Sequence, residues 1–524
     1  MESILNFFGM IPWYVYPIVF ILFIAIKDIF FNRRHTIKHN FPVVGHFRYL
    51  LEKIGPELRQ YIVSSNREEL PFNRSQRSWI YASSKKQNNY QSFGTDQDQS
   101  SPGFIFIKPA MFSYAVKEGH PNKVLPDAVP CAKVMGEHNK RKRPFRPYSV
   151  VNISGMSYGS LSARAVDSLN KGALKSGCFQ NTGEGALSPY HKNGADIMFH
   201  FGTGYFGVRD EKGNFSMSKL KDLVQENNFI RAIDLKLSQG AKPGKGGVLP
   251  AAKITKEISN IRHIPMGQDA LSPAYHSAFS NVPEMLDFME KMADETGLPV
   301  GFKSAVGRLE MWEELADRMV KENIGPDFIT IDGGEGGTGA APPAFADHVS
   351  LPFVYAFSSV YKIFAERGLT DRVVFLGSGK LGFPASSLMA FAMGVDCVSV
   401  AREAMMSVGC IQAQVCHTNR CPAGVATQNK WLQGGIDVPL KADRVNNYIR
   451  NLRKEILEIT HACGYEHPSQ MTMHDVDISM GDNNLTVPLD QAYHYVKTPV
   501  KFNSMQDLLN CPHLGRVNKE IIFS

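Results

Sequence analysis

Cysteine is scarce in this sequence, and neither sign of charge dominates it. Eight cysteines in 524 residues are too few for a disulfide scaffold of this length. Lysine and arginine number 57 against 50 aspartates and glutamates, a formal charge of +7. No dense basic stripe accompanies this mild excess, so we predict no nucleic-acid partner. Glycine is abundant at 44 residues but has no triplet period, which excludes collagen.

The sequence also lacks a Gly-x-Gly-x-x-Gly run after an early strand, so a Rossmann dinucleotide-binding domain is not supported. Hydrophobic residues make up 43% and charged residues 20%, as in ordinary globular proteins. The length suggests about three to four domains, or fewer if one of them is a large barrel.

A charge-free segment lies at the N-terminus. Residues 3–26 contain no Asp, Glu, Lys or Arg, and as a helix these 24 residues would extend about 36 Å, enough for a bilayer core of about 30 Å. Basic residues follow, among them Lys27, Arg33 and Arg34. The positive-inside tendency therefore predicts a single-pass membrane anchor over residues 1–31, with the rest of the chain in the cytoplasm. A hydrophobic arm packed on a partner and a cleaved signal are the alternatives.

After a mixed, partly polar linker over residues 32–101, short apolar runs alternate with helical patterns. Eight such units predict an α/β fold, a (β/α)8 TIM-type barrel over residues 102–463, followed by a C-terminal extension over residues 464–524. A doubly wound open sheet is the competing answer, but unusual residues follow all eight strands rather than one central crevice. The expected strands are residues 150–154, 178–182, 197–201, 232–237, 300–304, 328–332, 373–377 and 397–401, and two of the expected helices are residues 282–293 and 311–321.

Glycine-rich loops follow several of these strands, at the end of a barrel where chemistry usually takes place. Glycines let the backbone approach a flat ligand, and loop amides bind phosphate. A phosphate-bearing cofactor over the barrel mouth is the economical hypothesis. The candidate binding residues are Gly155, Met156, Ser157, Gln239, Gly333, Gly336, Gly337, Gly377, Gly379 and Arg402.

Three cysteines are closely spaced after the eighth strand, as Cys410-x5-Cys416-x4-Cys421-Pro. Thiolates at this spacing, the last followed by proline, suit an iron–sulfur cluster that lacks a fourth protein ligand. Zinc with His417 or another residue, and unligated buried cysteines, remain open alternatives. The other five cysteines are scattered and are expected to be small buried hydrophobes.

Lysines accumulate near the ends of the fourth and fifth strands. Lys236 lies near the end of the fourth strand, Lys242 and Lys245 follow it, and Lys303 lies near the end of the fifth. Several cations at one barrel mouth predict a site for an acidic substrate and for the negative charge of a reduced flavin. Glu184 is the best carboxylate candidate; its alternative role is an ion pair with one of these lysines.

The motifs SGMSYGSLS, NTGEGA, KLSQGAKPGKGG, DGGEGGTGAAP and GCIQAQVCHTNRCPAGVATQ occur in this order between about residues 150 and 428. Together they resemble the synthase domain of glutamate synthase, and particularly the short proteins of the FMN-binding glutamate synthase family. The resemblance implies a β/α barrel, one FMN, and a 3Fe-4S cluster on Cys410, Cys416 and Cys421. It also implies an oxidoreductase of the CH–NH2 class, in which 2-oxoglutarate and ammonia form 2-iminoglutarate and reduced FMN converts this to L-glutamate.

Carried over position by position, the resemblance places Lys236, Gln239 and Lys242 along the flavin and substrate site, with Glu184 and Lys303 also at site positions. We expect Glu184, Lys236, Lys242 and Lys303 to be catalytic. The chain departs from the family pattern at four positions: Lys245 replaces Glu, Val248 replaces Gln, Tyr205 replaces Arg, and Glu335 replaces Asp. The cofactor motifs are therefore kept better than the substrate motifs.

Two further expectations concern partners. Met1 is followed by Glu2, so we expect no N-terminal cysteine nucleophile for glutamine hydrolysis, and nothing resembles an FAD- or NADPH-binding module. A separate electron donor, such as ferredoxin or a reductase subunit, and free ammonia or another subunit would then supply the reaction. The basic run at residues 140–146 is a solvated lip or a contact for anionic lipid or an acidic electron donor. The alternative functions are an enzyme like methylamine–glutamate N-methyltransferase and a membrane-bound flavin and iron–sulfur electron-transfer subunit with an altered substrate.

Overall fold

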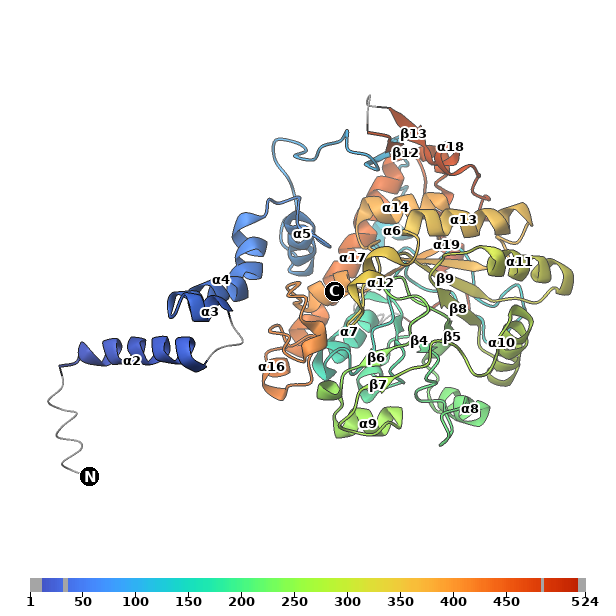
Figure 1. Cartoon of the computed structure of the whole chain (residues 1–524). Coiled ribbons are helices and arrows are strands. Elements are labelled where there is room, and N and C mark those ends of the chain that lie inside the picture. Colours follow the sequence, from blue (N-terminus) through green and yellow to red (C-terminus); the bar gives the residue numbers. More distant parts are fainter. Residues whose placement is uncertain (1–11, 32–35, 482–484, 517–524) are drawn as a thin grey trace. The chain divides into compact units, whose positions relative to one another are not determined.

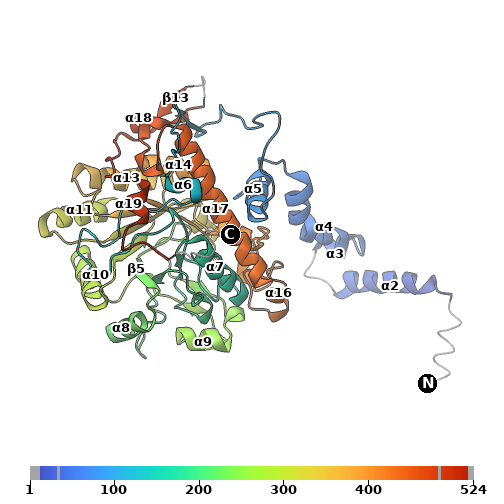
Figure 2. The ribbon, with the colours of Figure 1, turned by 180° about the vertical axis from the view of Figure 1, so that it is seen from behind.

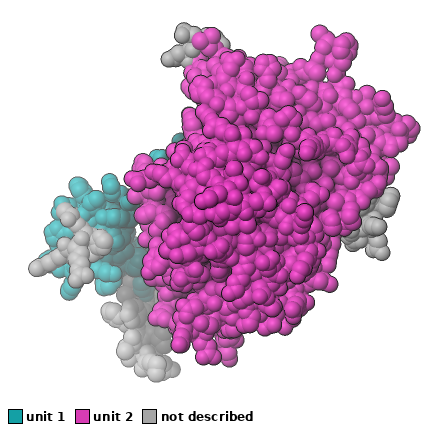
Figure 3. All heavy atoms as spheres, turned by 90° about the vertical axis from the view of Figure 1, so that its right-hand side faces the viewer, with its two compact units in different colours: residues 1–77 teal, residues 78–524 magenta. Residues whose placement is uncertain are grey.

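The structure is a computed structural model that describes residues 12–31, 36–481 and 485–516. The chain divides into two compact units, Met1–Arg77 and Ser78–Ser524, coloured separately in Figure 3. The predicted boundaries at residues 31, 101 and 463 stay predictions.

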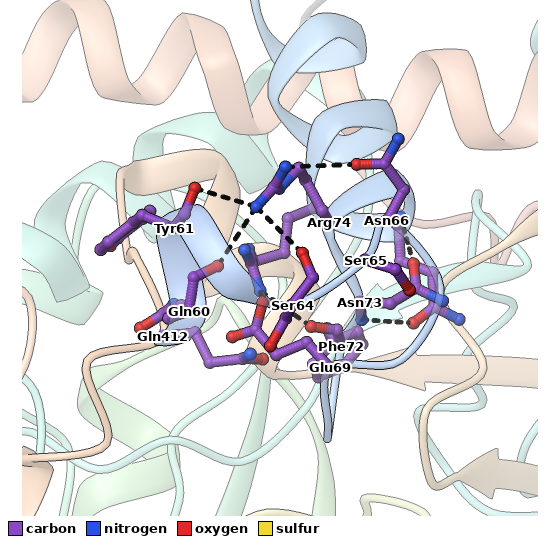
Figure 4. Close-up of polar contacts among 12 residues, drawn as sticks. Gln60, Tyr61, Ser64, Ser65, Asn66, Glu69, Phe72, Asn73, Arg74 and Gln412 are labelled. Atoms are coloured by element: carbon purple, nitrogen blue, oxygen red, sulfur yellow. Dashed lines mark hydrogen bonds and ion pairs between the residues drawn. The ribbon is translucent and has the colours of Figure 1, made fainter. Parts of the chain in front are cut away.

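The first unit is helical. Its elements are α2 (Val15–Ile26), the π-helical turn η1 (Lys27–Phe31), α3 (Thr36–Asn40), α4 (Val44–Leu58), the π-helical turn η2 (Arg59–Val63) and the start of α5 (Arg74–Ser84). Buried Asp28 accepts hydrogen bonds from His46 Nε2 at 2.8 Å and from the Val43 amide at 3.1 Å. Arg74 directs its guanidinium to the carbonyl oxygens of Tyr61 and Ser64, at 3.0 and 3.4 Å (Figure 4). Polar contacts thus join the end of η2 to the start of α5.

The predicted membrane-spanning helix is not found. Within the described ranges, none of the helices has the length and apolar character needed to cross a bilayer. Helix α2 begins only at Val15, and its 12 residues extend about 18 Å, against about 30 Å for a hydrocarbon core. Residues 1–11 of the predicted anchor lie outside the described residues.

The second unit contains the predicted barrel (Figure 1). Eight parallel strands close in the order β10-β11-β2-β3-β4-β5-β8-β9, which excludes the open-sheet alternative. All eight predicted strands are confirmed, because strands buried on both faces read as continuous apolar runs between Gly-rich loops. Their bounds are β2 Val151–Ile153, β3 Gln180–Asn181, β4 Ile197–Phe201, β5 Ile230–Lys236, β8 Val300–Ser304, β9 Phe328–Asp332, β10 Val374–Ser378 and β11 Cys397–Val400.

Helices surround these strands, and local signals explain where they start and stop. Ser162 caps α7 by accepting a hydrogen bond from the Ala165 amide, and Asn281 caps α10 in the same way. Helix α7 packs closely on α17 (Figure 2): a Cβ at Gly172 would lie 2.5 Å from Val445 Cβ. The helices of this unit are α6 Pro121–Val124, α7 Ala163–Ser176, α8 Met217–Glu226, α9 Lys256–Arg262, α10 Val282–Thr296, α11 Glu310–Glu322, α12 Pro343–His348, α13 Phe353–Glu366, α14 Pro384–Met393, α15 Arg402–Val408, α16 Lys430–Gly434, α17 Val438–Ala462, α18 Leu489–Tyr493 and α19 Met505–Leu509.

Two small antiparallel sheets accompany the barrel. Strand β12 (Val476–Ser479) pairs with β1 (Ile105–Ile107) and with β13 (Thr486–Pro488), so the C-terminal segment is joined to a segment that precedes the barrel. Strand β6 (Val248–Leu249) pairs with β7 (Ala270–Leu271) in the long insertion between β5 and β8. Single 3-10 turns complete the unit: η3 Pro189–His191, η4 Ala251–Lys253, η5 Cys416–Thr418, η6 Pro468–Gln470 and η7 Met473–Asp475.

The basic run at residues 140–146 is partly buried. Arg141 forms ion pairs with Glu290 at 2.7 Å and with Asp327 at 2.9 Å, and Arg146 Nη1 donates to the Cys131 carbonyl at 2.7 Å. Phe145 belongs to the buried cluster around the starts of the strands. Part of the basic run therefore binds to the barrel through ion pairs and hydrogen bonds, and only the rest of the run forms the predicted solvated lip.

Candidate functional site

The predicted catalytic side chains come together at one end of the barrel. Lys236 ends β5 and Lys303 lies in β8, while Glu184 and Lys242 follow β3 and β5. Carboxyl ends of parallel strands meet at the same rim of a barrel, which explains why positions about 120 residues apart in the sequence converge. Lys236 and Lys242 are buried, with 9% and 4% of their surface exposed.

Glu184 and Lys236 form the central ion pair. Lys236 Nζ lies 2.9 Å from Glu184 Oε1 and 2.6 Å from Gln239 Oε1. Burial alone would raise the pKa of Glu184, but the charge and hydrogen bond of Lys236, with the charges of His200 and Lys242, lower it to about 2. Glu184 is thus a fixed carboxylate that orients the ammonium group, as its alternative role predicts.

Lys242 and Lys303 hold their charges differently. Lys303 Nζ lies 3.4 Å from Asp332 Oδ2, which also accepts a hydrogen bond from the Gly240 amide at 2.8 Å. Lys242 Nζ donates to the Ala340 carbonyl at 2.9 Å. Burial and the neighbouring charge of Lys236 lower the pKa of Lys242 to about 8, although Glu184 acts in the opposite direction. Lys242 is therefore the cation of the mouth that is ready to accept an anionic ligand or to exchange a proton near neutral pH.

A buried polar network supports the mouth from inside the barrel, and the sequence analysis missed it. Asp234 Oδ2 accepts from Asn181 Nδ2 at 2.8 Å and lies 2.6 Å from His200 Nδ1. Asn181 Oδ1 in turn accepts from the Gly183 amide at 2.9 Å, one residue before Glu184. Asn181 stands in the NTGEGA motif, but His200 and Asp234 lie among apolar residues in β4 and β5, where no motif singles them out.

Tyr205, which departs from the family pattern, is a buried part of this support. Its hydroxyl lies 3.1 Å from His276 Nδ1 and accepts from the Ala278 amide at 3.2 Å, while His276 Nε2 donates to the Lys236 carbonyl at 2.8 Å. Burial lowers the pKa of His276 to about 4, so the ring is neutral at pH 7. A tyrosine here positions the end of β5 and brings no positive charge.

The predicted cofactor loops pack tightly against one another. A Cβ at Gly240 would lie 1.8 Å from the Gly333 carbonyl oxygen, and one at Gly155 would lie 2.8 Å from Asn181 Oδ1. A Cβ at Gly337 would lie 2.7 Å from Arg402 Cδ, whose guanidinium donates to the Glu335 carbonyl. A side chain at these positions would collide with a neighbouring loop, so glycine is needed for the loops to pack this closely. The remaining predicted glycines share this rim: at Gly333, Gly336, Gly377 and Gly379 a Cβ would lie 2.5, 3.0, 2.9 and 3.3 Å from the nearest atom.

Arg262 holds the loop after β2, and sequence reasoning missed it as well. Met156 and Ser157 of that loop are buried. Arg262 Nη2 donates to the Tyr158 carbonyl at 2.5 Å and to Ser157 Oγ at 3.3 Å. Burial lowers the pKa of Arg262 to about 10, while Glu184 acts in the opposite direction. Arg262 lies in α9, where a lone arginine in a helical pattern carries no signal.

The three clustered cysteines line one pocket, together with Met405, Val415 and Ala426. The loop around it is tightly wound, because Gln412, Gln414 and Asn419 have φ of 58°, 56° and 62°. Burial raises the pKa of Cys410 to about 12 and also raises that of Cys416, so these thiols stay protonated unless a metal displaces the proton. In the described ranges, no three His, Cys, Asp or Glu side chains are arranged to hold a single metal ion.

Lys253 joins the cysteine loop to the loop after β2. It is 2% exposed, and its Nζ donates to the Ser160 carbonyl at 2.6 Å and to the Cys416 carbonyl at 3.2 Å. Gln428 Nε2 makes a parallel connection to the Gly159 and Leu161 carbonyls, at 3.0 and 2.8 Å. On the outer side, the Tyr81 hydroxyl donates to the Cys410 carbonyl at 2.7 Å.

The residues present fit the two expected cofactors. The mouth combines a backbone wall with three lysines against two carboxylates, a balance that suits an anionic flavin and an acidic substrate. The cysteine pocket offers three sulfur ligands and no carboxylate, with Lys253 behind it, which suits an iron–sulfur cluster.

Comparisons with known proteins agree with this chemistry. A family model described as "Conserved region in glutamate synthase" matches residues 115–466. The chain is 41% identical over 512 residues to the glutamate synthase large subunit-like protein YerD of Bacillus subtilis, covering 91% of this chain and 96% of that protein. It is 35% identical over 316 residues to an archaeal-type glutamate synthase (NADPH) of Thermotoga neapolitana, and 34% identical over 321 residues to the archaeal glutamate synthase (NADPH) of Methanocaldococcus jannaschii.

The two archaeal-type matches each cover 60% of this chain and 59% of the relative. The YerD match, in contrast, extends over nearly the whole of both proteins. Membership of this family implies flavin and iron–sulfur cofactors, in accord with the mouth and the cysteine pocket. The chain belongs to the glutamate synthase family and is a glutamate synthase-like oxidoreductase of the CH–NH2 class.

Proposed function

We propose that the chain converts 2-oxoglutarate and ammonia, through 2-iminoglutarate, to L-glutamate at the mouth of the barrel. The observation that carries this proposal is the Glu184–Lys236–Gln239 group, with Lys242 beside it, on a rim of backbone walls. When bound, FMN supplies the hydride, and a 3Fe-4S cluster on Cys410, Cys416 and Cys421 supplies the electrons.

The side chains of the mouth divide the work. Lys236, held by Glu184, offers a charged N–H to a substrate carboxylate or to negative charge that develops at the mouth. Lys242, with a pKa lowered to about 8 by burial and by Lys236, supplies a proton to the substrate nitrogen. Lys303 is tied to Asp332 and places a further positive charge at the rim.

The test is anaerobic turnover. Purified full-length protein with a reduced one-electron donor, 2-oxoglutarate and ammonium should form L-glutamate, with none formed when any component is omitted. Transfer of a methylamino group to glutamate, with no synthesis from 2-oxoglutarate, would favour the methylamine–glutamate N-methyltransferase-like function. If the flavin is reduced and reoxidised but neither L-glutamate nor the methylamino-transfer product forms, the result would favour an electron-transfer subunit.

The electron donor is proposed to be a separate protein. Relatives bear names that include NADPH, and one from Pyropia yezoensis is called ferredoxin-dependent, with 29% identity over 396 residues. Comparing the rates of flavin reduction by reduced ferredoxin and by NADPH alone would identify the donor. Rapid reduction by NADPH alone would contradict a separate protein donor.

We further propose that residues 1–31 hold the protein at a membrane, with the barrel on the cytoplasmic side. The support is the apolar surface of α2, where Ile18, Phe20 and Phe23 are 54, 62 and 63% exposed. The full chain should sediment with membranes, and a variant lacking residues 1–31 should not. Equal distribution of the two proteins would contradict this attachment.

A further inference from the structure

Lys253 is a buried cation for which the polypeptide offers no anion. It ends the short turn η4, is 2% exposed, and its two hydrogen-bond acceptors are neutral carbonyls, those of Ser160 and Cys416. No ion pair involves its ammonium group within residues 12–31, 36–481 and 485–516. Two lysines of the barrel mouth, in contrast, pair with carboxylates: Lys236 with Glu184 and Lys303 with Asp332.

The position of Lys253 identifies the missing anion. Its ammonium group donates to the carbonyl of Cys416, one of the three cysteines that line the cysteine pocket. Burying an ammonium group without a counter-charge is strongly unfavourable, and two carbonyls offset this cost only in part. Thiolates that bind iron carry the negative charge that the thiols lack.

We propose that Lys253 is the fixed counter-charge of the iron–sulfur cluster and raises its reduction potential. The inference rests on the proposed ligand set of Cys410, Cys416 and Cys421. Reduction adds one electron to the cluster, and a positive charge held behind the Cys416 backbone stabilises the reduced form relative to the oxidised form. Lys253 is thus a positioning and tuning residue, not a catalytic one, because its contacts are the carbonyls of Ser160 and Cys416.

The alternative is that Lys253 is a structural staple, a residue that only joins the two loops through hydrogen bonds to the Ser160 and Cys416 carbonyls. A staple needs hydrogen-bond donors but no charge, so Lys253→Gln separates the two roles. In the counter-charge role, the cluster of this variant is reduced at a more negative potential than in the wild type, and Lys253→Arg restores the potential. In the staple role, all three proteins have the same potential.

The experiment is an EPR-monitored redox titration of the purified full-length proteins, with iron content measured on the same samples. Lys256→Gln is the matched control, because Lys256 is exposed in the first turn of α9, three residues away. A negative shift in Lys253→Gln alone supports the proposal, and an unchanged potential at full iron content overturns it.

Loss of iron is also informative. If Lys253→Gln binds no cluster, the Lys253→Arg protein decides: iron at the wild-type level supports a need for charge, and no iron in either variant overturns it in favour of packing. If the wild-type protein itself contains no iron, the proposed cluster is wrong. Failure of the cluster assignment can therefore be distinguished from failure of the counter-charge proposal.

Discussion

At the barrel mouth, Lys236 lies 2.9 Å from Glu184 and Lys303 lies 3.4 Å from Asp332, whereas Lys253 behind the cysteine loop contacts only carbonyl oxygens. Both regions bury lysine next to a glycine-rich loop. The mouth neutralises most of its charge with its own carboxylates and is therefore largely formed before any ligand arrives. The cysteine loop leaves its charge to be neutralised by what binds there, so this region depends on its ligand.

The largest effect is expected at the cysteine loop, the region that depends on its ligand. Cys416→Ser removes one of the three sulfur donors of the pocket, and we expect almost complete loss of iron and of the cluster absorption, because no spare ligand is in place. Iron analysis and visible spectra measure this. Cys511→Ser, at a cysteine outside the pocket, is the control, and a full cluster in Cys416→Ser would refute the ligand assignment.

The next largest effect is expected at the barrel mouth, where the lysines are neutralised by carboxylates of the protein itself. Glu184→Gln leaves Lys236 with only neutral partners, so we expect glutamate formation to fall by about 10²-fold or more. The free energy of unfolding should fall by about 2–3 kcal/mol, since one partner of a largely buried pair is removed. Activity assays and urea unfolding test both, with exposed Glu211→Gln as control. Unchanged activity would show that the pair only supports the fold.

The same pair gives a pH dependence. The pKa of Glu184 falls from 4.5 to about 2 in the folded protein, because the charge of Lys236 outweighs the effect of burial. Its stabilisation is therefore complete above about pH 5 and is lost as the pH falls towards 2, by about 3 kcal/mol in all. The difference in unfolding free energy between wild type and Glu184→Gln should be constant from pH 8 to 6 and shrink below pH 4.5. A constant difference down to pH 3 would contradict this origin.

The smallest effect concerns the outer side of the cysteine loop. Tyr81→Phe removes the hydrogen bond to the Cys410 carbonyl, 2.7 Å long, and should cost about 1 kcal/mol of stability without loss of iron. Urea unfolding of the iron-loaded protein measures this, with Tyr90→Phe, at a 94% exposed tyrosine, as control. Equal stabilities of the two variants would show that water replaces the contact.

The sequence predicts those features of the molecule that neighbouring residues determine, and it does not predict those that depend on contacts between distant residues. Strands such as residues 300–304 and 328–332 agree residue for residue with the structure, because a buried parallel strand is an apolar run between polar loops. Glu184, Lys236 and the three cysteines stand in recognisable motifs at strand ends. Lys253, Arg262 and Asp234 do not, because their roles come from contacts with carbonyls and side chains up to 163 positions away. The membrane-spanning helix is predicted from a charge-free run and the basic residues after it, and neither feature fixes where a helix begins.

The hydrogen bonds of Gln428 have a consequence for how the protein is made. Its side-chain amide holds the Gly159 and Leu161 carbonyls, so the loop after β2 has its final shape only when the segment after Cys421 is in place. Ala426 of that segment also lines the cysteine pocket. We therefore expect binding of iron there and ordering of the loop after β2 to be coupled during biogenesis, and amide hydrogen exchange in that loop should slow when iron is inserted.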